Sequence, residues 1–128
     1  MKRVINTKFA PKAIGPYSQA ILSNNTLYCS GQIAIEPKSG KLITVNIQKE
    51  TEQIMNNIGA VLSAADMDYN NIVKCSIFMR NMQDYQEINK IYSNFFDSLP
   101  PAREAFQVSK LPKNANIEIS IIAVKWKT

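Results

Sequence analysis

Apolar and polar side chains alternate in several short stretches of the chain, and this period of two is typical of β-strands. Ser23-Asn24-Asn25 supplies good turn chemistry between two of these stretches. In the stretch that begins at Ile72, the alternation places Val73, Cys75 and Ile77 on one face together with Met79. The pattern predicts strands at 4–5, 18–22, 26–33, 72–79, 102–108 and 117–126.

Two other stretches repeat their apolar residues at spacings of three and four, which predicts amphipathic helices. The first helix is expected to begin at Ile47, with Asn46 as its N-cap, and to stop near Asp66. The second is expected to continue until Pro100-Pro101 ends it. Its apolar stripe consists of Tyr85, Ile88, Tyr92 and Phe95.

The order of these elements is strands, helix, strand, helix, strand, strand, which favours an α+β fold with both helices on one face of a mixed sheet. The final strand has apolar residues on both of its faces. They are Ile117, Ile119 and Ile121 on one face and Ile122, Val124 and Trp126 on the other. Two helices cover only one face of a sheet, so the other face needs a partner. We therefore expect an oligomer that packs sheet against sheet.

The length of 128 residues suits one domain spanning 1–128. Histidine is absent, which excludes Ser-His-Asp and Cys-His catalysis. Cys29 and Cys75 lie in strand-like stretches and are expected to be buried free thiols. Two cysteines without histidine do not build a usual zinc site, so no metal is expected. Any chemistry must therefore come from carboxylates, Arg, Lys, Tyr, Ser, thiols or the backbone.

The formal charge is +5, from 15 basic and 10 acidic residues. Twelve of the basic residues are lysines scattered along the chain, whereas a nucleic-acid site usually concentrates its charge and relies on arginine. The charge therefore favours a solvated surface that attracts small anions, and nucleic-acid binding is not expected. No apolar stretch approaches the ~20 residues of a membrane helix, and no secretory signal is visible. We expect a cytoplasmic protein without membrane contact.

Two charged residues break the apolar pattern. Glu118 interrupts the final strand, where a buried carboxylate is costly unless it is paired or hydrogen-bonded. A solvent-facing position on an edge strand, or a structural ion pair, would also explain it. Arg103 begins a short strand after Pro101, and its planar fork matches a carboxylate. A surface arginine is the competing interpretation.

Three polar features are weaker signals. Tyr17 follows a rigid Gly-Pro turn and is either a site hydroxyl or a core residue. The glycine in Ser30-Gly31 either lets a ligand or another chain approach the backbone or marks a β-bulge. Asn89 lies in the second predicted helix, where asparagine is mildly unfavourable and often makes a specific hydrogen bond.

Taken together, the chain resembles the reactive intermediate deaminase (Rid) family, specifically its RidA-type members. The resemblance covers about 6–124 and depends on the combination and spacing of the motifs. The segments that carry it are Ala13-Ile14-Gly15-Pro16-Tyr17-Ser18-Gln19-Ala20, Ser30-Gly31-Gln32-Ile33, Pro101-Ala102-Arg103, Phe106, Ser109, Lys110-Leu111-Pro112-Lys113 and Ile117-Glu118-Ile119.

The resemblance implies a chorismate-mutase-like fold and a homotrimer whose sheets form a central barrel, with three clefts between subunits. It also implies cofactor-free hydrolysis of enamines and imines to 2-oxo acids and ammonia. The implied substrates are 2-aminoacrylate and 2-aminocrotonate or their imine tautomers, 2-iminopropanoate and 2-iminobutanoate. These compounds are released by pyridoxal-phosphate dehydratases, which implies a functional link to those enzymes.

On this resemblance, Arg103 clamps the substrate carboxylate, and Glu118 holds and polarises the attacking water. The apolar strand would raise the pKa of Glu118, while an adjacent cation would oppose that shift. Tyr17 lines the cleft and completes the catalytic set. The residues expected to bind the substrate are Ser30, Gly31, Asn89 and Ala105, the last through its backbone carbonyl.

The chain departs from the family at two positions. Ala105 replaces the usual cysteine, and Glu104 stands where a small residue is usual. The loss of the thiol bears on rate and substrate preference more than on the type of reaction. Strand parity predicts that Glu104 points away from the face that bears Arg103. If it faced Arg103 instead, it would compete with the substrate carboxylate.

The sequence leaves open how Arg103 and Glu118 meet, because a simple hairpin around Pro112 would place Arg103 opposite Ile122. Three other functions also remain open. A chaperone-like or structural trimer would not need Arg103 for its function. A regulatory trimer could bind small carboxylates without turnover. A ribonuclease or translation inhibitor is less favoured, because histidine is absent and the lysines are scattered.

Overall fold

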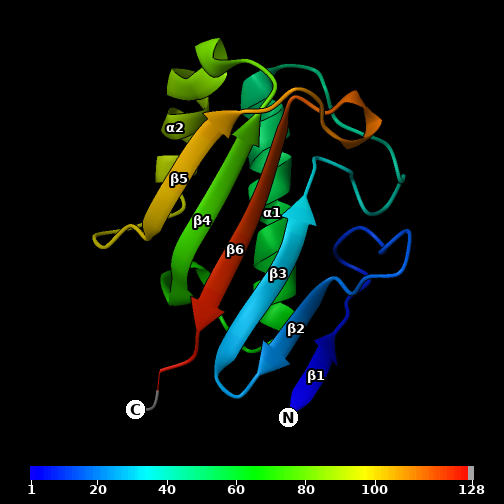
Figure 1. The fold of residues 1–128 in the computed structure, drawn as a ribbon, viewed down its shortest axis with the longest axis vertical. Helices are drawn as coiled ribbons and strands as arrows, with labels where there is room; N and C mark the ends of the chain where they lie inside the picture. The colour runs from blue at the N-terminus through cyan, green and yellow to red at the C-terminus, as the bar shows by residue number, and fades with distance from the viewer. Residues whose placement is uncertain (127–128) are drawn as a thin grey trace.

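A computed structural model describes residues 1–126. Six strands form one sheet in the order β1-β2-β3-β6-β4-β5, and all neighbouring pairs are antiparallel except the parallel pair β4 and β5. The strands are β1 (Lys2–Ile5), β2 (Ala20–Ser23), β3 (Thr26–Gln32), β4 (Ile72–Met79), β5 (Ala102–Gln107) and β6 (Ile117–Val124). Figure 1 shows β6 in the middle of the sheet, although it is the last strand in the sequence.

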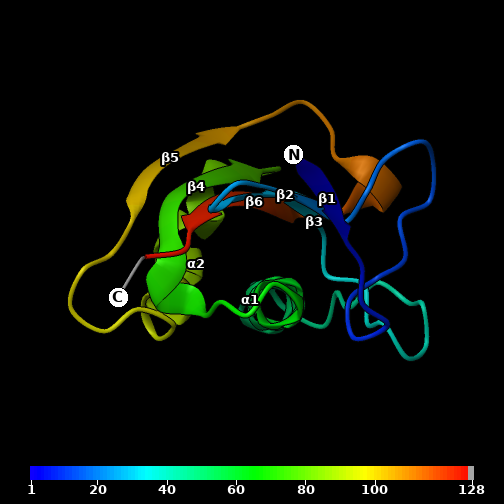
Figure 2. The same cartoon turned by 90° about the horizontal axis from the view of Figure 1, so that it is seen from below.

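Two helices, α1 (Ile47–Ala64) and α2 (Tyr85–Ser93), pack on the same face of the sheet. In Figure 2, α1 and α2 lie together below the sheet. Short 3-10 turns complete the fold at η1 (Tyr69–Asn71), η2 (Met82–Asp84) and η3 (Pro112–Asn114). The expected α+β class with both helices on one face is therefore confirmed.

The long helix α1 begins as the sequence predicts. The side chain of Asn46 accepts a hydrogen bond of 2.8 Å from the backbone N–H of Lys49, which satisfies one of the free donors at the helix start. The helix buries an apolar stripe that includes Ile54, Ile58 and Val61 against the sheet. This stripe and the inward residues of the sheet make up the hydrophobic core.

The second helix is shorter than expected. It ends at Ser93, well before the two prolines, and Phe95 lies beyond it. The backbone N–H of Phe95 bonds to the carbonyl of Tyr92, an i to i−3 contact that closes the last turn. The ring of Phe95 then packs against Tyr69, with 5.1 Å between ring centroids. The helix therefore ends beside the contact between Phe95 and Tyr69, and not at Pro100-Pro101.

Strand boundaries differ from the expected ones by one or two residues at several ends. A larger difference occurs in β4, where the register shifts between Ile72 and Lys74. This shift places Ile72 on the buried face and leaves Val73 only partly buried, so the expected face of Val73 was wrong. A β-bulge inserts an extra residue on one strand, and alternation alone does not reveal it.

The sheet face opposite the helices carries an apolar row that crosses four strands. Pairing places Val4 beside Ile21, Ile21 beside Tyr28, and Tyr28 beside Ile122. Tyr28 is 51% exposed and Val4 is 58% exposed. We refer to Val4, Ile21, Tyr28 and Ile122 as the open-face row. The helices leave this row uncovered, as the two-sided apolar pattern of the last strand predicted.

Candidate active site

Arg103 lies on β5, at the edge of the sheet, and points to the helix side. Its neighbour across the sheet is Cys75, which is fully buried beneath the helices. The guanidinium donates one hydrogen bond of 2.8 Å to the side-chain oxygen of Asn89 and another of 2.8 Å to the hydroxyl of Tyr85. The centroid of the Tyr92 ring lies 5.0 Å from the guanidinium carbon. These contacts fix the position of Arg103, which is therefore not a simple surface arginine.

The partners of Arg103 come from one face of α2. Tyr85 and Asn89 are four residues apart, so they lie one above the other on the helix. The specific hydrogen bond expected for Asn89 is therefore the bond to Arg103. The sequence placed Tyr85 in the apolar stripe and did not reveal its polar contact. The i, i+4 spacing to Asn89 was the one signal that linked them.

Three of the five N–H donors of Arg103 are not used by these two hydrogen bonds. The side chain lines a cavity together with Asn89, Ser93, Pro100 and Pro101. A planar guanidinium with free donors in a cavity matches the geometry of a carboxylate. This arrangement can hold a small carboxylic acid.

Residues after Arg103 alternate across β5 as predicted. Ala105 pairs with buried Ile77 and shares the helix-side face with Arg103. Glu104 points to the opposite face, where it accepts hydrogen bonds from the hydroxyl of Ser76 and from the Lys74 ammonium, the latter at 3.0 Å. The bond from Ser76, followed by the contact with Lys74, lowers the pKa of Glu104. Glu104 therefore does not compete for a carboxylate bound at Arg103 of the same chain.

Glu118 lies on β6, which is a central strand and not an edge strand. Its neighbours Ile117 and Ile119 point into the core, so Glu118 points to the open face. Burial raises the pKa of its carboxyl group, in the expected direction. Within residues 1–126 it forms no ion pair. A half-buried carboxyl group with a raised pKa is suited to proton transfer.

Ser30-Gly31 forms a bulge in β3 directly beside Glu118. Cys29 pairs with Ile121 but Gln32 pairs with Ile119, so two residues of β3 oppose one residue of β6. A Cβ atom on Gly31 would lie only 2.5 Å from Oε2 of Glu118. The predicted bulge is therefore present, and the close neighbour of Gly31 is the Glu118 side chain of the same chain.

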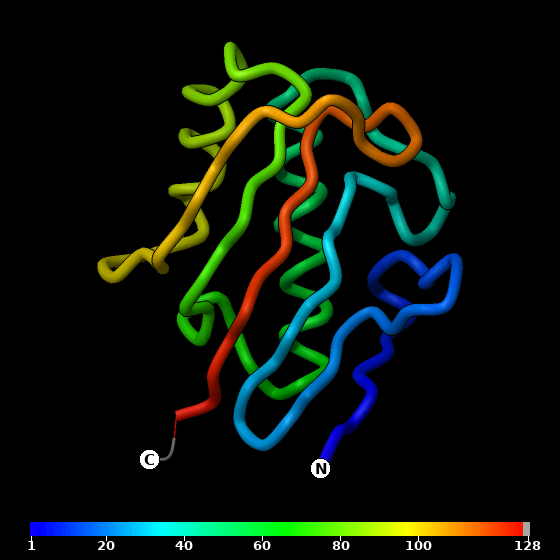
Figure 3. Tube along the Cα trace, viewed as in Figure 1, coloured from blue at the N-terminus to red at the C-terminus, as the bar shows by residue number. Residues whose placement is uncertain are grey.

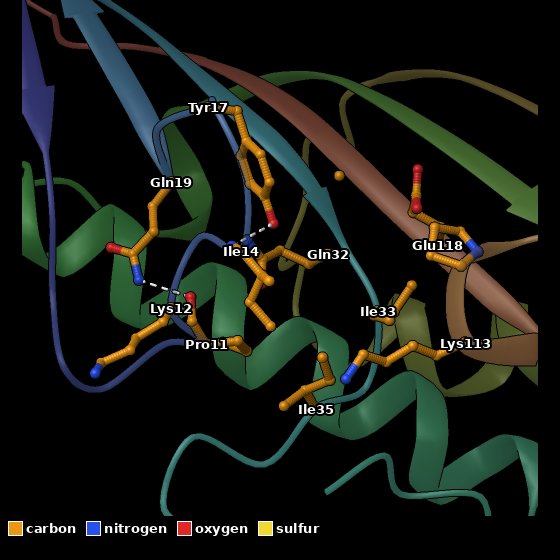
Figure 4. Close-up of a pocket in the computed structure, with 12 residues that line it drawn as sticks. Pro11, Lys12, Ile14, Tyr17, Gln19, Gln32, Ile33, Ile35, Lys113 and Glu118 are labelled. Carbon is orange, nitrogen blue, oxygen red and sulfur yellow. Dashed lines mark hydrogen bonds between the residues drawn. The ribbon is translucent and has the colours of Figure 1, made fainter. Parts of the chain in front are cut away.

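The other wall beside Glu118 comes from the loop before β2. Tyr17 is 53% exposed, so it is not a core residue, and its hydroxyl accepts a hydrogen bond of 3.3 Å from the backbone N–H of Ile14. Ser30 donates a hydrogen bond of 2.6 Å to the carbonyl of Ser18, which ties this loop to the bulge. Tyr17, Gly31 and Glu118 line one cavity of about 220 Å³, and Figure 4 shows the Tyr17 hydroxyl directed into it.

Two buried polar side chains that support this cavity were not singled out from the sequence. Gln19 binds the N-terminal loop, accepting from the N–H of Thr7 at 2.7 Å and donating to the carbonyl of Pro11 at 2.8 Å. Glu50 of α1 accepts two hydrogen bonds of 2.8 Å each from Asn116, the residue before β6. Neither Gln19 nor Glu50 interrupts an apolar stretch of the sequence. Their hydrogen-bond partners are therefore evident only from the fold.

The expected site residues fall into two groups within one chain. Arg103, Asn89 and Ala105 lie on the helix side, while Tyr17, the Ser30-Gly31 bulge and Glu118 lie on the open side. The chain trace in Figure 3 shows β4 between β5 and β6. The hairpin alternative around Pro112 is therefore wrong, and a single chain does not bring Arg103 and Glu118 together.

The described residues contain no group of three His, Cys, Asp or Glu side chains able to hold a metal ion. Cys29 and Cys75 are buried and free, as expected. Burial raises their pKa to about 12 and about 11, respectively, which keeps both thiols protonated at neutral pH. None of the helices in 1–126 has the length and apolar character needed to cross a membrane.

Comparison with known proteins places these features in a family. The family described as endoribonuclease L-PSP matches residues 7–125. A Yersinia pestis protein of the conserved Rid family superposes with a TM-score of 0.95 at 48% identity, over 98% of this chain and 100% of that one. The chain belongs to the Rid family. The resemblance noted from the sequence is therefore confirmed.

Two further relatives of this Rid chain carry information on ligands. The human 2-iminobutanoate/2-iminopropanoate deaminase is 44% identical over 125 residues, which cover 98% of this chain and 91% of the human protein. The structure of Escherichia coli TdcF with bound serine superposes with a TM-score of 0.93 at 34% identity, over 97% of this chain and 99% of that one. Relatives of this Rid chain thus include a deaminase and an amino-acid complex.

Proposed function

We propose that this protein hydrolyses small enamines and imines, 2-aminoacrylate/2-iminopropanoate and 2-aminocrotonate/2-iminobutanoate, to 2-oxo acids and ammonia. The observation that carries the proposal is the Glu118 carboxyl group, which has a raised pKa and sits in a cavity against Gly31. A carboxylate there can accept a proton from water beside a bound imine. The similarity to the human deaminase supports the same reaction.

In this mechanism Arg103 binds the substrate carboxylate through its free donors, and Glu118 orients a water molecule toward the imine carbon. The water oxygen forms a bond to that carbon, the π electrons of the carbon–nitrogen bond move to nitrogen, and Glu118 passes one proton of the water to nitrogen. Glu118 then takes the hydroxyl proton of this adduct and delivers it to nitrogen as the carbonyl forms, the carbon–nitrogen bond breaks, and ammonia and a 2-oxo acid leave. The imine tautomer of the substrate already contains the carbon–nitrogen double bond, so the residues perform this addition and elimination without a cofactor.

The site is proposed to form between chains. Arg103 and Glu118 point to opposite faces of one sheet, so a carboxylate clamped by one copy meets water held by another. The uncovered open-face row supplies apolar surface for the assembly. We assign the assembly as a homotrimer with the sheets facing a central barrel, as the family resemblance implies. Ser30, Gly31, Asn89 and Ala105 then line the shared cleft with Tyr17.

The chemistry of the substrates indicates the protein's place in metabolism. Enamines and imines of this size are released by pyridoxal-phosphate dehydratases, so we place the protein downstream of such enzymes, in the cytoplasm. Its metabolite partners are then imino and 2-oxo acids.

A second candidate is a regulatory trimer that binds small carboxylates without turnover. The observation that favours it is the structural likeness to TdcF, which was solved with bound serine. A third candidate function is endoribonuclease activity, which the description of the family model names. The scattered lysines and the lack of histidine argue against an endoribonuclease.

The test couples the purified protein to a threonine dehydratase and follows the formation of 2-oxobutanoate. The wild type should accelerate it, while Arg103→Ala and Glu118→Gln should not. Binding of 2-oxobutanoate without faster formation of this product would support a regulatory trimer. RNA cleavage that survives both substitutions would support the endoribonuclease.

A further inference from the structure

The cavity beside Glu118 does not end at the catalytic carboxyl group. A second cavity of about 200 Å³ adjoins it and shares Pro11, Lys12, Ile14, Ile35 and Lys113 as common walls. The second cavity extends to Pro37 and Gly40 in the loop before α1. A substrate held at Glu118 therefore has space for a side chain that points away from the reacting carbon.

Lys113 lines the second cavity, which we refer to as the extension. Figure 4 shows its side chain reaching from η3 toward Ile35, while the side chain of Lys12 extends away from Glu118. Lys113 and Asn114 both have left-handed backbone conformations, with φ angles of 55° and 56°. Asparagine adopts this conformation readily, but for lysine it is unfavourable and persists where the surroundings enforce it. The two hydrogen bonds from Asn116 to buried Glu50 anchor the end of this turn.

The charges around the extension are unbalanced. Among residues 1–126, Glu118 is the one acidic residue that lines either cavity, and it lies at the opposite end from Ile35. Within the described part of the chain, neither Lys12 nor Lys113 forms an ion pair. The walls between the two ends include Ile14, Ile33 and Ile35, beside the uncharged polar side chains of Gln19 and Gln32. An ammonium group at the end of such a passage favours a ligand with a second anionic group.

We propose that Lys113 extends the substrate range of the site to imino acids whose side chain ends in a second carboxylate, and that it favours them over uncharged side chains of equal length. This inference rests on the proposed deamination. The shared site holds the first carboxylate at Arg103 and the imine carbon at Glu118. The methylene groups of the side chain then contact Ile14 and Ile35, and the distal carboxylate accepts a charge-assisted hydrogen bond from the Lys113 ammonium. Lys113 does not take part in the bond changes of the hydrolysis, so it is a specificity residue.

The test compares two ligand series of equal chain length that differ in the distal carboxylate. The imines of glutamate and norvaline, generated by an amino-acid oxidase, are the substrates, and 2-oxoglutarate and 2-oxopentanoate are the ligands for calorimetric binding. The variants are Lys113→Met, which keeps the aliphatic stem, and Lys113→Arg, which keeps the charge. Lys110→Met is the matched control, because Lys110 is exposed on the same loop and lines neither cavity.

The ratio of kcat/KM for the glutamate imine over the norvaline imine should fall about tenfold in Lys113→Met, the usual effect of losing one charge-assisted hydrogen bond. It should be restored in Lys113→Arg and unchanged in Lys110→Met, and 2-oxoglutarate affinity should follow the same order. An unchanged ratio in Lys113→Met, with turnover intact, would overturn the inference. Lys113-dependent binding of 2-oxoglutarate without turnover of any imine would support this ligand class and reject deamination instead.

Discussion

At the scale of single residues, the candidate site depends on close contacts more than on residue types. Arg103 and Glu118 stand out from the sequence because each is a charge in an apolar stretch. Their neighbours do not stand out. The bond from Arg103 to Tyr85, and the approach of Glu118 to Gly31, become evident only when strands and helices are placed in space.

Gly31→Ala tests the contact with Glu118. The new Cβ atom would lie 2.5 Å from Oε2 and 2.8 Å from Cδ of Glu118, so the carboxyl group must move. Because a displacement of about 1 Å in a catalytic group costs about 100-fold, we expect kcat/KM to fall by that order. The displaced atoms end a flexible side chain, so the free energy of unfolding should change by less than about 1 kcal/mol. Full activity in a folded variant would show that the position of Glu118 does not matter.

Tyr85→Phe and Tyr92→Phe form a matched pair on α2. The Tyr85 hydroxyl accepts a hydrogen bond of 2.8 Å from Arg103, whereas the buried Tyr92 hydroxyl has no hydrogen-bond partner within 1–126. Loss of a hydrogen bond to a charged group should raise KM for the imine about tenfold in Tyr85→Phe. Tyr92→Phe keeps its ring beneath the guanidinium and should leave KM nearly unchanged. Equal effects in steady-state assays would argue against the role given to Tyr85.

At the scale of elements, the sequence predicted what depends on local periodicity. The start of α1 at Ile47 and the span of β4 at 72–79 follow from apolar spacing and an N-cap. The parallel pairing of β4 with β5, and the place of β6 between β3 and β4, depend on contacts between distant segments. The end of α2 at Ser93 coincides with a contact between distant segments, the packing of Phe95 on Tyr69. The local pattern of apolar residues does not determine which strands pair or where α2 ends.

Glu50→Ala tests the connection between α1 and the start of β6. The substitution leaves the backbone N–H and the side-chain amide of Asn116 without their acceptors, and it opens a buried space. We expect a loss of about 3 kcal/mol in the free energy of unfolding, measured by urea denaturation at fixed protein concentration. Glu52→Ala, on the exposed side of the same helix, should cost less than about 0.5 kcal/mol. Similar losses would mean that the buried carboxylate does not anchor β6.

At the scale of the whole molecule, the two faces of the sheet separate the two charged residues of the proposed site. The helix face is covered and holds Arg103, while the open face exposes an apolar row and holds Glu118. The sequence predicted the uncovered face from the final strand, because its apolar residues occur on both sides. It did not predict that the two charged residues point in opposite directions, because that depends on the parallel pairing of β5.

Tyr28→Asp tests the role of the open-face row in assembly. A charge in the middle of this row would have to be buried between copies, which is costly without a partner. We expect light scattering to change from a trimer to a monomer, with loss of deaminase activity. Val45→Asp changes an exposed apolar residue in the loop before α1 and should leave the trimer intact. A trimeric Tyr28→Asp protein would place the interface elsewhere.

The most direct test of the shared site mixes two inactive variants. Arg103→Ala and Glu118→Gln are unfolded together and refolded as mixed oligomers, and deamination of 2-iminobutanoate is measured beside each variant refolded alone. If Arg103 and Glu118 act across an interface, random assembly gives about a quarter of the interfaces both native side chains, and activity should return to about that fraction of wild type. If mixed oligomers form but activity does not return, the two residues do not act across an interface, and the shared site is refuted.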